Sequence, residues 1–307
     1  MGRRCLVIGA SGQLGSAVCA ALRSTGDEVI EGVHRFPRAD QVRVDLCEPH
    51  EVASTIQPLK PEWIIIAGAF CGVDRAETER EVCVRVNVKG PQAIAEYAND
   101  HGAFVVYYST DHVFDGAHTS YTERDPVRPL NVYARSKAEG EAVIRARSPQ
   151  RHLVIRTASL YGADRQRRNF VLRLVDQLRQ GERVPVAEDQ WGSPTSTEDL
   201  AQATRWLMAR HAVGTFHATG PEFVDRVSFA RTVCAHFDLE VSRVIPTPTH
   251  RLGQPAQRPL RVHLDCRKLF TSGCPPFRSY EEGLRLLRQW EMALQGSLVS
   301  QPQRVEP

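Results

Sequence analysis

A threonine, a tyrosine and a lysine have types and spacing that allow proton exchange with a carbonyl oxygen. Thr110 ends an apolar run, and a Tyr-x-x-x-Lys sequence follows 23 residues later at Tyr133 and Lys137. The segment 134–146 is rich in Ala, Glu, Lys and Arg, which predicts a helix with both side chains on one face. We expect the lysine ammonium to favour the phenolate and to lower the tyrosine pKa from about 10 toward neutrality. Thr110 would then be a second hydrogen-bond partner for the same oxygen.

A glycine-rich turn near the start of the chain offers a place for a dinucleotide. The apolar run 5–8 predicts a buried strand and the run 16–23 a helix, with Gly9, Gly12 and Gly15 between them. Free N–H groups at a helix start suit a pyrophosphate, and glycine lets the backbone approach it. A glycine motif alone is weak and can mark only a tight turn, but the strand-then-helix context favours cofactor binding.

The end of the next predicted strand, 29–33, is where a dinucleotide fold selects its cofactor. An acid there binds the ribose hydroxyls, whereas a base accepts a 2′-phosphate. This chain has His34 and Arg35 at that point and no acid in the following four residues. NADP(H) is therefore the expected cofactor; if Arg35 is only a loop residue, NAD(H) is the alternative.

Strand and helix patterns alternate through the first half of the chain. Further strands are expected at 42–46, 63–66 and 103–109. The first of these ends at an acid, Asp45, that could meet the adenine, and the small residues after the second would let a cofactor lie against the backbone. Such alternation predicts an α/β fold with a doubly wound parallel sheet, the Rossmann arrangement.

The pattern changes after residue 162, which predicts two domains. We expect a cofactor-binding Rossmann domain over 1–162 and a smaller C-terminal α/β lobe over 163–296 that binds the substrate. A segment of about 185–218 is expected to return to the first domain. The polar residues 297–307 are expected to form a disordered tail.

Composition and charge exclude several classes of function. The chain has 307 residues, of which 42% are apolar and 24% charged, and the net charge is +3. Its basic residues are dispersed, so no nucleic-acid partner is expected, and no run of 18 apolar residues predicts a membrane span. Eight cysteines without Cys-x-x-Cys pairs or zinc spacing indicate reduced thiols, no metal site and a cytoplasmic protein.

With these elements placed, the chain resembles the dTDP-4-dehydrorhamnose reductase family of the extended short-chain dehydrogenase/reductases over about residues 4 to 290. The motifs that carry the resemblance are Gly9-x-x-Gly12-x-x-Gly15, Val73-Asp74-x-Ala76-Glu77, Asn87, Ser109-Thr110-Asp111-x-Val113-Phe114-Asp115-Gly116, Tyr133-x-x-x-Lys137, Asp189-Gln190-x-Gly192-x-Pro194-Thr195 and Arg258-Pro259. The resemblance implies a reductase that transfers a hydride from NADPH to the C4 carbonyl of a nucleotide-linked 4-keto-6-deoxy sugar.

The patterns and the resemblance together give the candidate site. The catalytic residues would be Thr110, Tyr133 and Lys137, with Tyr133 as proton donor. The cofactor would be held by Gly9, Ser11, Gly12, Gln13, Leu14, Gly15, His34, Arg35, Asp45, Leu46, Ala67, Gly68, Ala69, Asn87, Tyr133 and Lys137. The substrate side would comprise Cys71, Asp111, His112, Ser159, Asn169, Gln190 and Arg258. A homodimer is compatible with this interpretation.

Three expected substrate residues depart from the family pattern. Cys71 replaces a usual threonine, His112 a usual tyrosine and Ser159 a usual tryptophan. The changes remove a large apolar wall, add a titratable group and weaken a hydrogen-bond donor. They favour a 4-keto sugar other than dTDP-4-dehydro-L-rhamnose, unless the family tolerates these exchanges.

Two other functions share the fold. Nucleotide-sugar dehydratases resemble the chain but have Thr-Asp-Glu where it has Thr110-Asp111-His112, so the missing glutamate counts against elimination. The regulatory β subunit of methionine adenosyltransferase resembles the same family, also in the run from Ala256 to Cys266. Such a protein would bind NADP and a partner enzyme without catalysis. The intact Thr, Tyr and Lys favour an enzyme.

Overall fold

A seven-stranded parallel sheet lies at the centre of the computed structural model, which describes residues 2–35 and 37–299. Its order is β11-β6-β5-β4-β1-β2-β3, and every neighbouring pair is parallel. The strands are β1 (Arg4–Ile8), β2 (Glu28–Val33), β3 (Gln41–Arg43), β4 (Trp63–Ile66), β5 (Phe104–Thr110), β6 (His152–Thr157) and β11 (Gly214–His217). The strand order reverses between β1 and β4, where such sheets bind ligands. The predicted Rossmann fold is confirmed.

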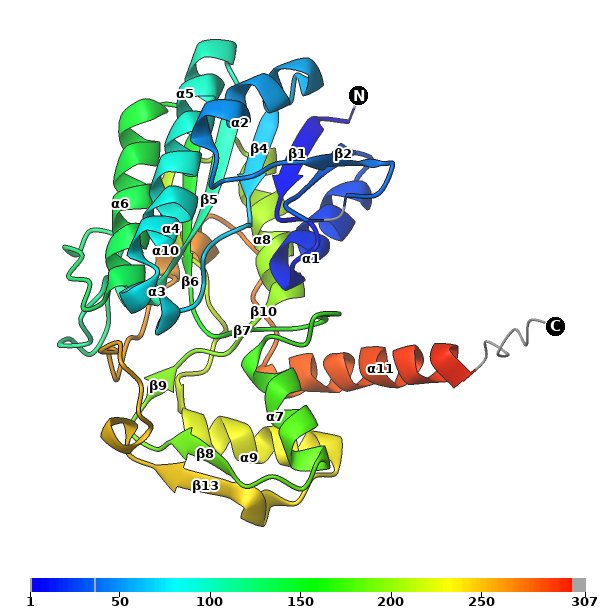
Figure 1. Ribbon diagram of the computed structural model, residues 1–307, viewed down its shortest axis with the longest axis vertical. Helices are drawn as coiled ribbons and strands as arrows, with labels where there is room; N and C mark the ends of the chain where they lie inside the picture. The colour runs from blue at the N-terminus through cyan, green and yellow to red at the C-terminus, as the bar shows by residue number, and fades with distance from the viewer. Residues whose placement is uncertain (1, 36, 300–307) are drawn as a thin grey trace.

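Helices cover both faces of this sheet (Figure 1). On one face lie α1 (Gln13–Arg23) and α8 (Thr197–Ala209), and on the other α2 (Pro49–Ile56), α5 (Gly90–His101) and α6 (Val132–Arg147). The central strand β4 reads Trp-Ile-Ile-Ile, and all four side chains are buried. Both faces of this strand are covered by helices, so side chains on either face are removed from water. This explains the continuous apolar run.

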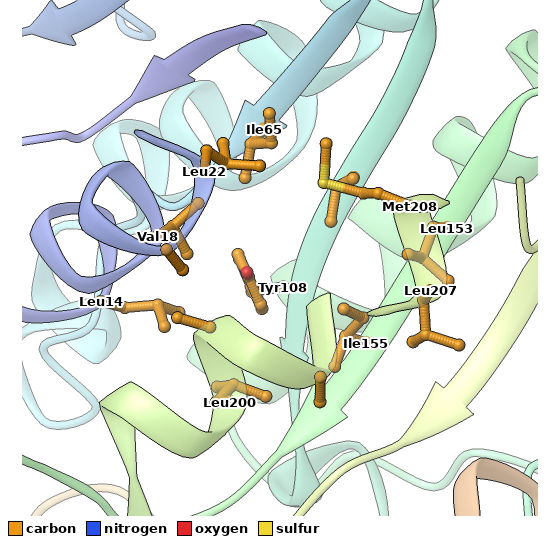
Figure 2. Close-up of a cluster of buried hydrophobic side chains, with 14 of the residues drawn as sticks. Leu14, Val18, Leu22, Ile65, Tyr108, Leu153, Ile155, Leu200, Leu207 and Met208 are labelled. Carbon is orange, nitrogen blue, oxygen red and sulfur yellow. The ribbon is translucent and has the colours of Figure 1, made fainter. Parts of the chain in front are cut away.

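The core under α1 shows how periodicity sets the packing. Leu14, Val18 and Leu22 recur every fourth residue, so they share one face of the helix. Figure 2 shows them pointing toward side chains of α8 and of strands β4, β5 and β6. The Tyr108 hydroxyl, on β5, is hydrogen bonded to that of Thr204, on α8, at 2.6 Å. This polar pair is therefore satisfied inside an apolar layer.

A smaller lobe follows the sheet domain. It contains α7 (Phe170–Arg179), α9 (Arg226–Phe237) and the parallel pair β8 (Val184–Ala187) and β13 (Val244–Thr247), with α11 (Tyr280–Val299) packed against them. Of the segment expected to return to the sheet domain, about 185–218, the residues from Thr195 to Ala218 lie against that domain and β8 does not; Leu269, Cys274 and Phe277 lie against it as well. The difference arises because β8 pairs with β13 in the lobe.

Short elements connect these parts. They are β7 (Leu160–Tyr161), β9 (Trp191–Gly192), β10 (Thr195–Ser196), β12 (Val224–Asp225), α3 (Arg75–Thr78), α4 (Arg80–Val84), α10 (Arg267–Thr271) and five single turns, η1 (Gln57–Leu59), η2 (Arg85–Lys89), η3 (Asp111–Val113), η4 (Val241–Arg243) and η5 (Thr249–Arg251).

Two sequence-based boundaries differ from the structure. The third strand, expected over 42–46, is β3 and ends at Arg43. Of the tail expected over 297–307, residues 297–299 belong to α11, and residues 300–307 lie outside the described part. Within residues 2–35 and 37–299, no helix combines the length and the apolar character that crossing a membrane requires.

A buried ion pair joins α6 to the sheet. The Glu141 carboxylate accepts two hydrogen bonds from the Arg156 guanidinium, at 2.8 and 2.7 Å, and neither side chain is more than 4% exposed. Glu141 lies one helical turn after Lys137, and Arg156 lies on β6. The pair therefore fixes the helix that carries the candidate catalytic residues.

Replacing Glu141→Gln should destabilise the fold strongly. The substitution keeps the shape but leaves the Arg156 guanidinium buried without its counter-ion, which costs about 3–5 kcal/mol. Chemical denaturation would measure the change in the free energy of unfolding. The matched control is Glu81→Gln, which breaks the exposed pair with Arg85 (2.9 Å) and should cost less than about 1 kcal/mol. Equal small losses in both variants would contradict the account.

Candidate active site

Thr110 is the last residue of β5, at the edge of the sheet where the cleft opens. Its hydroxyl donates to the Asp111 carboxylate at 2.9 Å and accepts from the His112 N–H at 3.2 Å. The Thr110 proton thus points to Asp111, so donation to a substrate oxygen requires the hydroxyl to rotate. One further lone pair remains for a neighbouring donor.

The helix that carries Tyr133 and Lys137 has a firmly held N-terminus. Asn131 caps α6, its side-chain oxygen accepting from the Ala134 N–H at 2.8 Å. The Glu77 carboxylate accepts from the Val132 N–H at 2.8 Å. Both contacts satisfy N–H groups that a helix start leaves unpaired. The position of Tyr133, one residue further on, follows from these bonds.

Lys137 is buried beneath the cleft. It is only 3% exposed, and its ammonium lies 3.9 Å from the centroid of the Tyr107 ring. No carboxylate lies within 4 Å of it in the described part of the chain. Burial lowers the pKa of Lys137 to about 8, an effect that the charge of Glu141 partly opposes.

The expectation that the pKa of Tyr133 is lowered toward neutrality is wrong. Burial raises the pKa of Tyr133 well above its ordinary value, and the neighbouring Cys71 raises it further, while the Thr110 hydroxyl only partly offsets this. The effect of burial on the Tyr133 pKa is larger than the effect of the Lys137 charge one turn away. Burial also disfavours the charged form of Lys137 itself. Tyr133 is therefore a neutral hydroxyl, which is the form that can donate a proton.

Asn87 holds the loop after β4 against α6. Its side-chain oxygen accepts from the Phe70 N–H at 2.9 Å, and its amide donates to the Phe70 carbonyl (3.1 Å) and to the Ser136 hydroxyl (2.9 Å). The residue is 1% exposed and lies in the π-helical turn η2, a feature common near functional sites. These contacts give Asn87 a positioning role.

The three glycines of the turn have different reasons to be glycine. A Cβ at Gly9 would lie 2.5 Å from the Gly68 nitrogen, and one at Gly15 would lie 2.1 Å from the Gly9 carbonyl oxygen. Gly9 and Gly15 are therefore required by the packing of the protein itself, because a side chain at either position would clash with the backbone. A Cβ at Gly12 would meet only that same oxygen, at 3.3 Å, so the space above Gly12 is open.

The same turn fits the pyrophosphate of a dinucleotide. Gly12 precedes α1, whose first turn has no side-chain cap and no acidic residue. Its N–H groups and positive dipole end are thus available to an anion. Ser11, Gln13 and Leu14 adjoin this end, and the segment Ala67, Gly68 and Ala69 follows β4 beside Gly9. The Gln166 side chain donates to the Ser11 carbonyl at 3.2 Å, which links the turn to the loop before α7.

A basic group stands where the adenosine end of the cofactor is expected. Asp45 binds the His34 ring at 3.1 Å and the Arg43 guanidinium at 3.3 Å. Arg35 is exposed and has no partner in the described part of the chain. Arg43 is a residue that the sequence analysis missed, because only the register of β2 and β3, which pairs Val33 with Arg43, brings it beside His34. Leu46 is buried close by along the chain.

A cleft of about 630 Å³ is lined by residues of both the sheet domain and the lobe. Thr110 and Tyr133 line it, together with six expected substrate residues: Cys71, Asp111, His112, Ser159, Gln190 and Arg258. The seventh, Asn169, does not line the cleft. It is 5% exposed and caps α7, accepting from the Leu172 N–H (3.0 Å) and donating to the Gly162 carbonyl (3.1 Å). The structure gives it a capping role.

The cleft also contains residues that the sequence analysis did not select. Arg173 and Arg226 come from α7 and α9, and Trp191 follows Gln190 in the chain. Asp74 holds Arg258 through two bonds of 2.9 and 2.6 Å. The position of Asp74 in a family motif was a usable signal, whereas the two other arginines are recognisable only from the folded lobe.

The RmlD substrate binding domain family model matches residues 3–291. A dTDP-4-dehydrorhamnose reductase of Sinorhizobium fredii is 32% identical over 95% of this chain and 99% of its own. A dTDP-4-keto-6-deoxy-D-glucose reductase of Streptomyces niveus is 33% identical over 95% of each chain. The crystal structure of a dTDP-4-dehydrorhamnose reductase of Bacillus anthracis in complex with NADP superimposes with a TM-score of 0.85, at 29% identity, over 94% of this chain and 99% of that one.

A relative of another kind matches less of its own length. The methionine adenosyltransferase 2 subunit beta of Danio rerio is 31% identical over 87% of this chain and 84% of its own. The sequence resemblance to both kinds of protein is thus confirmed. With a family model that spans nearly all of the described residues, and relatives that match from end to end, this chain belongs to the RmlD substrate binding domain family.

Proposed function

We propose that this chain is an NADPH-dependent reductase of a nucleotide-linked 4-keto-6-deoxy sugar. The observation that carries the proposal is the meeting of Thr110 and a neutral Tyr133 at the surface of one cleft, with Lys137 buried behind them. This arrangement supplies a proton donor and a hydrogen-bond partner to a carbonyl oxygen.

The residues of the site would have the following roles in the reaction. Tyr133 donates its proton to the oxygen at C4, and the Thr110 hydroxyl orients that oxygen. The Lys137 ammonium stabilises the negative charge that Tyr133 then acquires and holds the nicotinamide ribose. When bound, NADPH supplies the hydride that converts the carbonyl carbon to an alcohol carbon.

The cofactor would lie along the carboxyl edge of the sheet. The turn Gly9–Gly15 would hold the pyrophosphate, and Arg35 with Arg43 would meet the 2′-phosphate that distinguishes NADP(H) from NAD(H). His34, which Asp45 orients, adds a third basic group. NAD(H) is the weaker alternative.

The identity of the sugar depends on the three residues that depart from the family pattern. Cys71, His112 and Ser159 all line the cleft, and His112 Nδ1 is buried without a hydrogen-bond partner in the described part of the chain. A substrate hydroxyl or amide could satisfy that nitrogen. We propose a 4-keto sugar with a different ring substitution from dTDP-4-dehydro-L-rhamnose, that sugar being the alternative.

The second candidate is a non-catalytic NADP-binding regulatory subunit. The similarity to a methionine adenosyltransferase subunit favours it. The hydroxyls of Thr110 and Tyr133, which line the same cleft, count against it, because binding of NADP alone does not require a proton donor and a second hydrogen-bond partner there.

The proposal also covers the compartment, the domain division and the assembly. All eight cysteines are free, which supports a reducing compartment such as the cytoplasm. A cofactor domain over 1–162 and a substrate lobe over 163–296 remain the proposed division. A homodimer remains the proposed assembly.

Purified protein should oxidise NADPH in the presence of a nucleotide 4-keto sugar, and Tyr133→Phe should abolish this. Loss of the general acid lowers kcat about 10²- to 10⁴-fold, while NADPH affinity stays within about threefold because the ring is kept. A panel of such sugars that includes dTDP-4-dehydro-L-rhamnose would be assayed by NADPH absorbance. Tight NADPH binding without reduction of any sugar would contradict the reductase function and support the regulatory one. Normal turnover by Tyr133→Phe would show that Tyr133 is not the proton donor.

Wild-type protein should bind NADPH more tightly than NADH, and Arg35→Ala should remove most of the difference. A charge-assisted contact to phosphate contributes about 1.5–3 kcal/mol, which is about ten- to a hundredfold in affinity. Arg38→Ala is the matched control, since Arg38 is exposed but already lies within 4 Å of Glu31 and Asp40. Titration of both cofactors would measure the affinities. Equal binding of NADPH and NADH to the wild type would refute the assignment.

NADPH binding should weaken as pH rises through about 8. Below the pKa of Lys137, about 8 in the free protein, the ammonium can donate to the ribose hydroxyls, and above it that charge is lost. Dissociation constants measured across this range would show the loss in wild type but not in Lys137→Met. An unchanged affinity on both sides of that pKa would show that Lys137 does not bind the cofactor as a cation.

A further inference from the structure

Three arginines from the C-terminal half of the chain line the cleft, and they differ in their partners. Arg258 is bound to Asp74 by two hydrogen bonds, at 2.9 and 2.6 Å. Arg173 and Arg226 have no carboxylate within 4 Å in the described part of the chain. Both of these line the cleft, one from α7 and the other from the first turn of α9.

Arg226 is the more enclosed of the two unpaired residues. Its guanidinium carbon lies 4.2 Å from the centroid of the Phe170 ring, on the wall of the cleft. Burial, together with repulsion from Arg173 and Arg258, lowers the pKa of Arg226 to about 10. The folded protein thus keeps mutually repelling cations in one partly dehydrated place, which costs free energy unless an anion completes the site.

We infer that Arg226 and Arg173 together bind the diphosphate of the nucleotide moiety of the substrate. A guanidinium matches phosphate oxygens with two parallel hydrogen bonds, and a diphosphate has enough oxygens for both side chains. Arg258 is neutralised by Asp74, so the free positive charge of this wall belongs to the other two residues. The inference rests on the proposed function and adds to it the residues that recognise the nucleotide.

The competing source of negative charge is an acidic substituent on the sugar ring. Ligands that lack the sugar ring distinguish a diphosphate from an acidic ring substituent. Nucleoside diphosphates carry the diphosphate alone, and the matching nucleosides carry neither group.

The experiment is calorimetric titration of the NADP⁺-loaded protein with dTDP, UDP, GDP and CDP, and with thymidine as the uncharged reference. At least one diphosphate should bind, and Arg226→Met should weaken it about ten- to a hundredfold, with Arg226→Lys intermediate. Thymidine affinity and NADP⁺ affinity should not change. Arg231→Met is the matched control, because Arg231 is an exposed residue of the same helix that does not line the cleft.

Two results would overturn the inference. One is unchanged diphosphate affinity in both Arg226→Met and Arg173→Met, which would leave an acidic sugar substituent as the ligand of these residues. The other is failure of all four diphosphates to bind the wild type. Neither result decides the reductase activity, which the NADPH-oxidation assay tests separately. Retained NADP⁺ affinity in each variant excludes misfolding as the cause of a loss.

Discussion

The burial of Lys137, with the partial burial of Tyr133 on the same helix, is the constraint on which the rest of the site depends. Lys137 is held against the Tyr107 ring with almost no exposed surface, and Tyr133 lies one turn earlier at the surface of the cleft. Burial disfavours the charged form of both groups, so it lowers the lysine pKa and raises that of the tyrosine. The tyrosine is therefore kept as an acid, in the form that reduction of a carbonyl requires.

Much of the surrounding structure holds that helix in place. Asn131 and Glu77 satisfy the N–H groups of its first turn, and Glu141 fastens its middle to β6 through Arg156. Asn87 connects the loop after β4 to the same helix through the Ser136 hydroxyl. Thr110 and Tyr133 line the cleft beside the Asp111 carboxylate, and across it Arg173 and Arg226 have no carboxylate within 4 Å in the described part of the chain.

Sequence reasoning succeeded where the signal is local. A strand end, an i, i+4 pair on a helix and a glycine turn between strand and helix are fixed by a few neighbouring residues, and the structure brings Thr110, Tyr133 and Lys137 together as expected. It did not reach features that depend on distant parts of the chain. Asn169 fits a ligand motif but caps a helix, Arg43 reaches His34 only through strand register, and the direction of the Tyr133 shift depends on burial that no motif records.

The central claim is that burial, rather than the charge of Lys137, sets the protonation state of Tyr133. The direct measurement is an NMR titration of protein labelled with ¹³C at the tyrosine ring carbon that bears the hydroxyl, with Tyr133→Phe used to assign one resonance among the seven tyrosines. The account predicts that the Tyr133 resonance does not shift until the pH exceeds about 10, the ordinary tyrosine value. Ionisation of Tyr133 near neutral pH would contradict it.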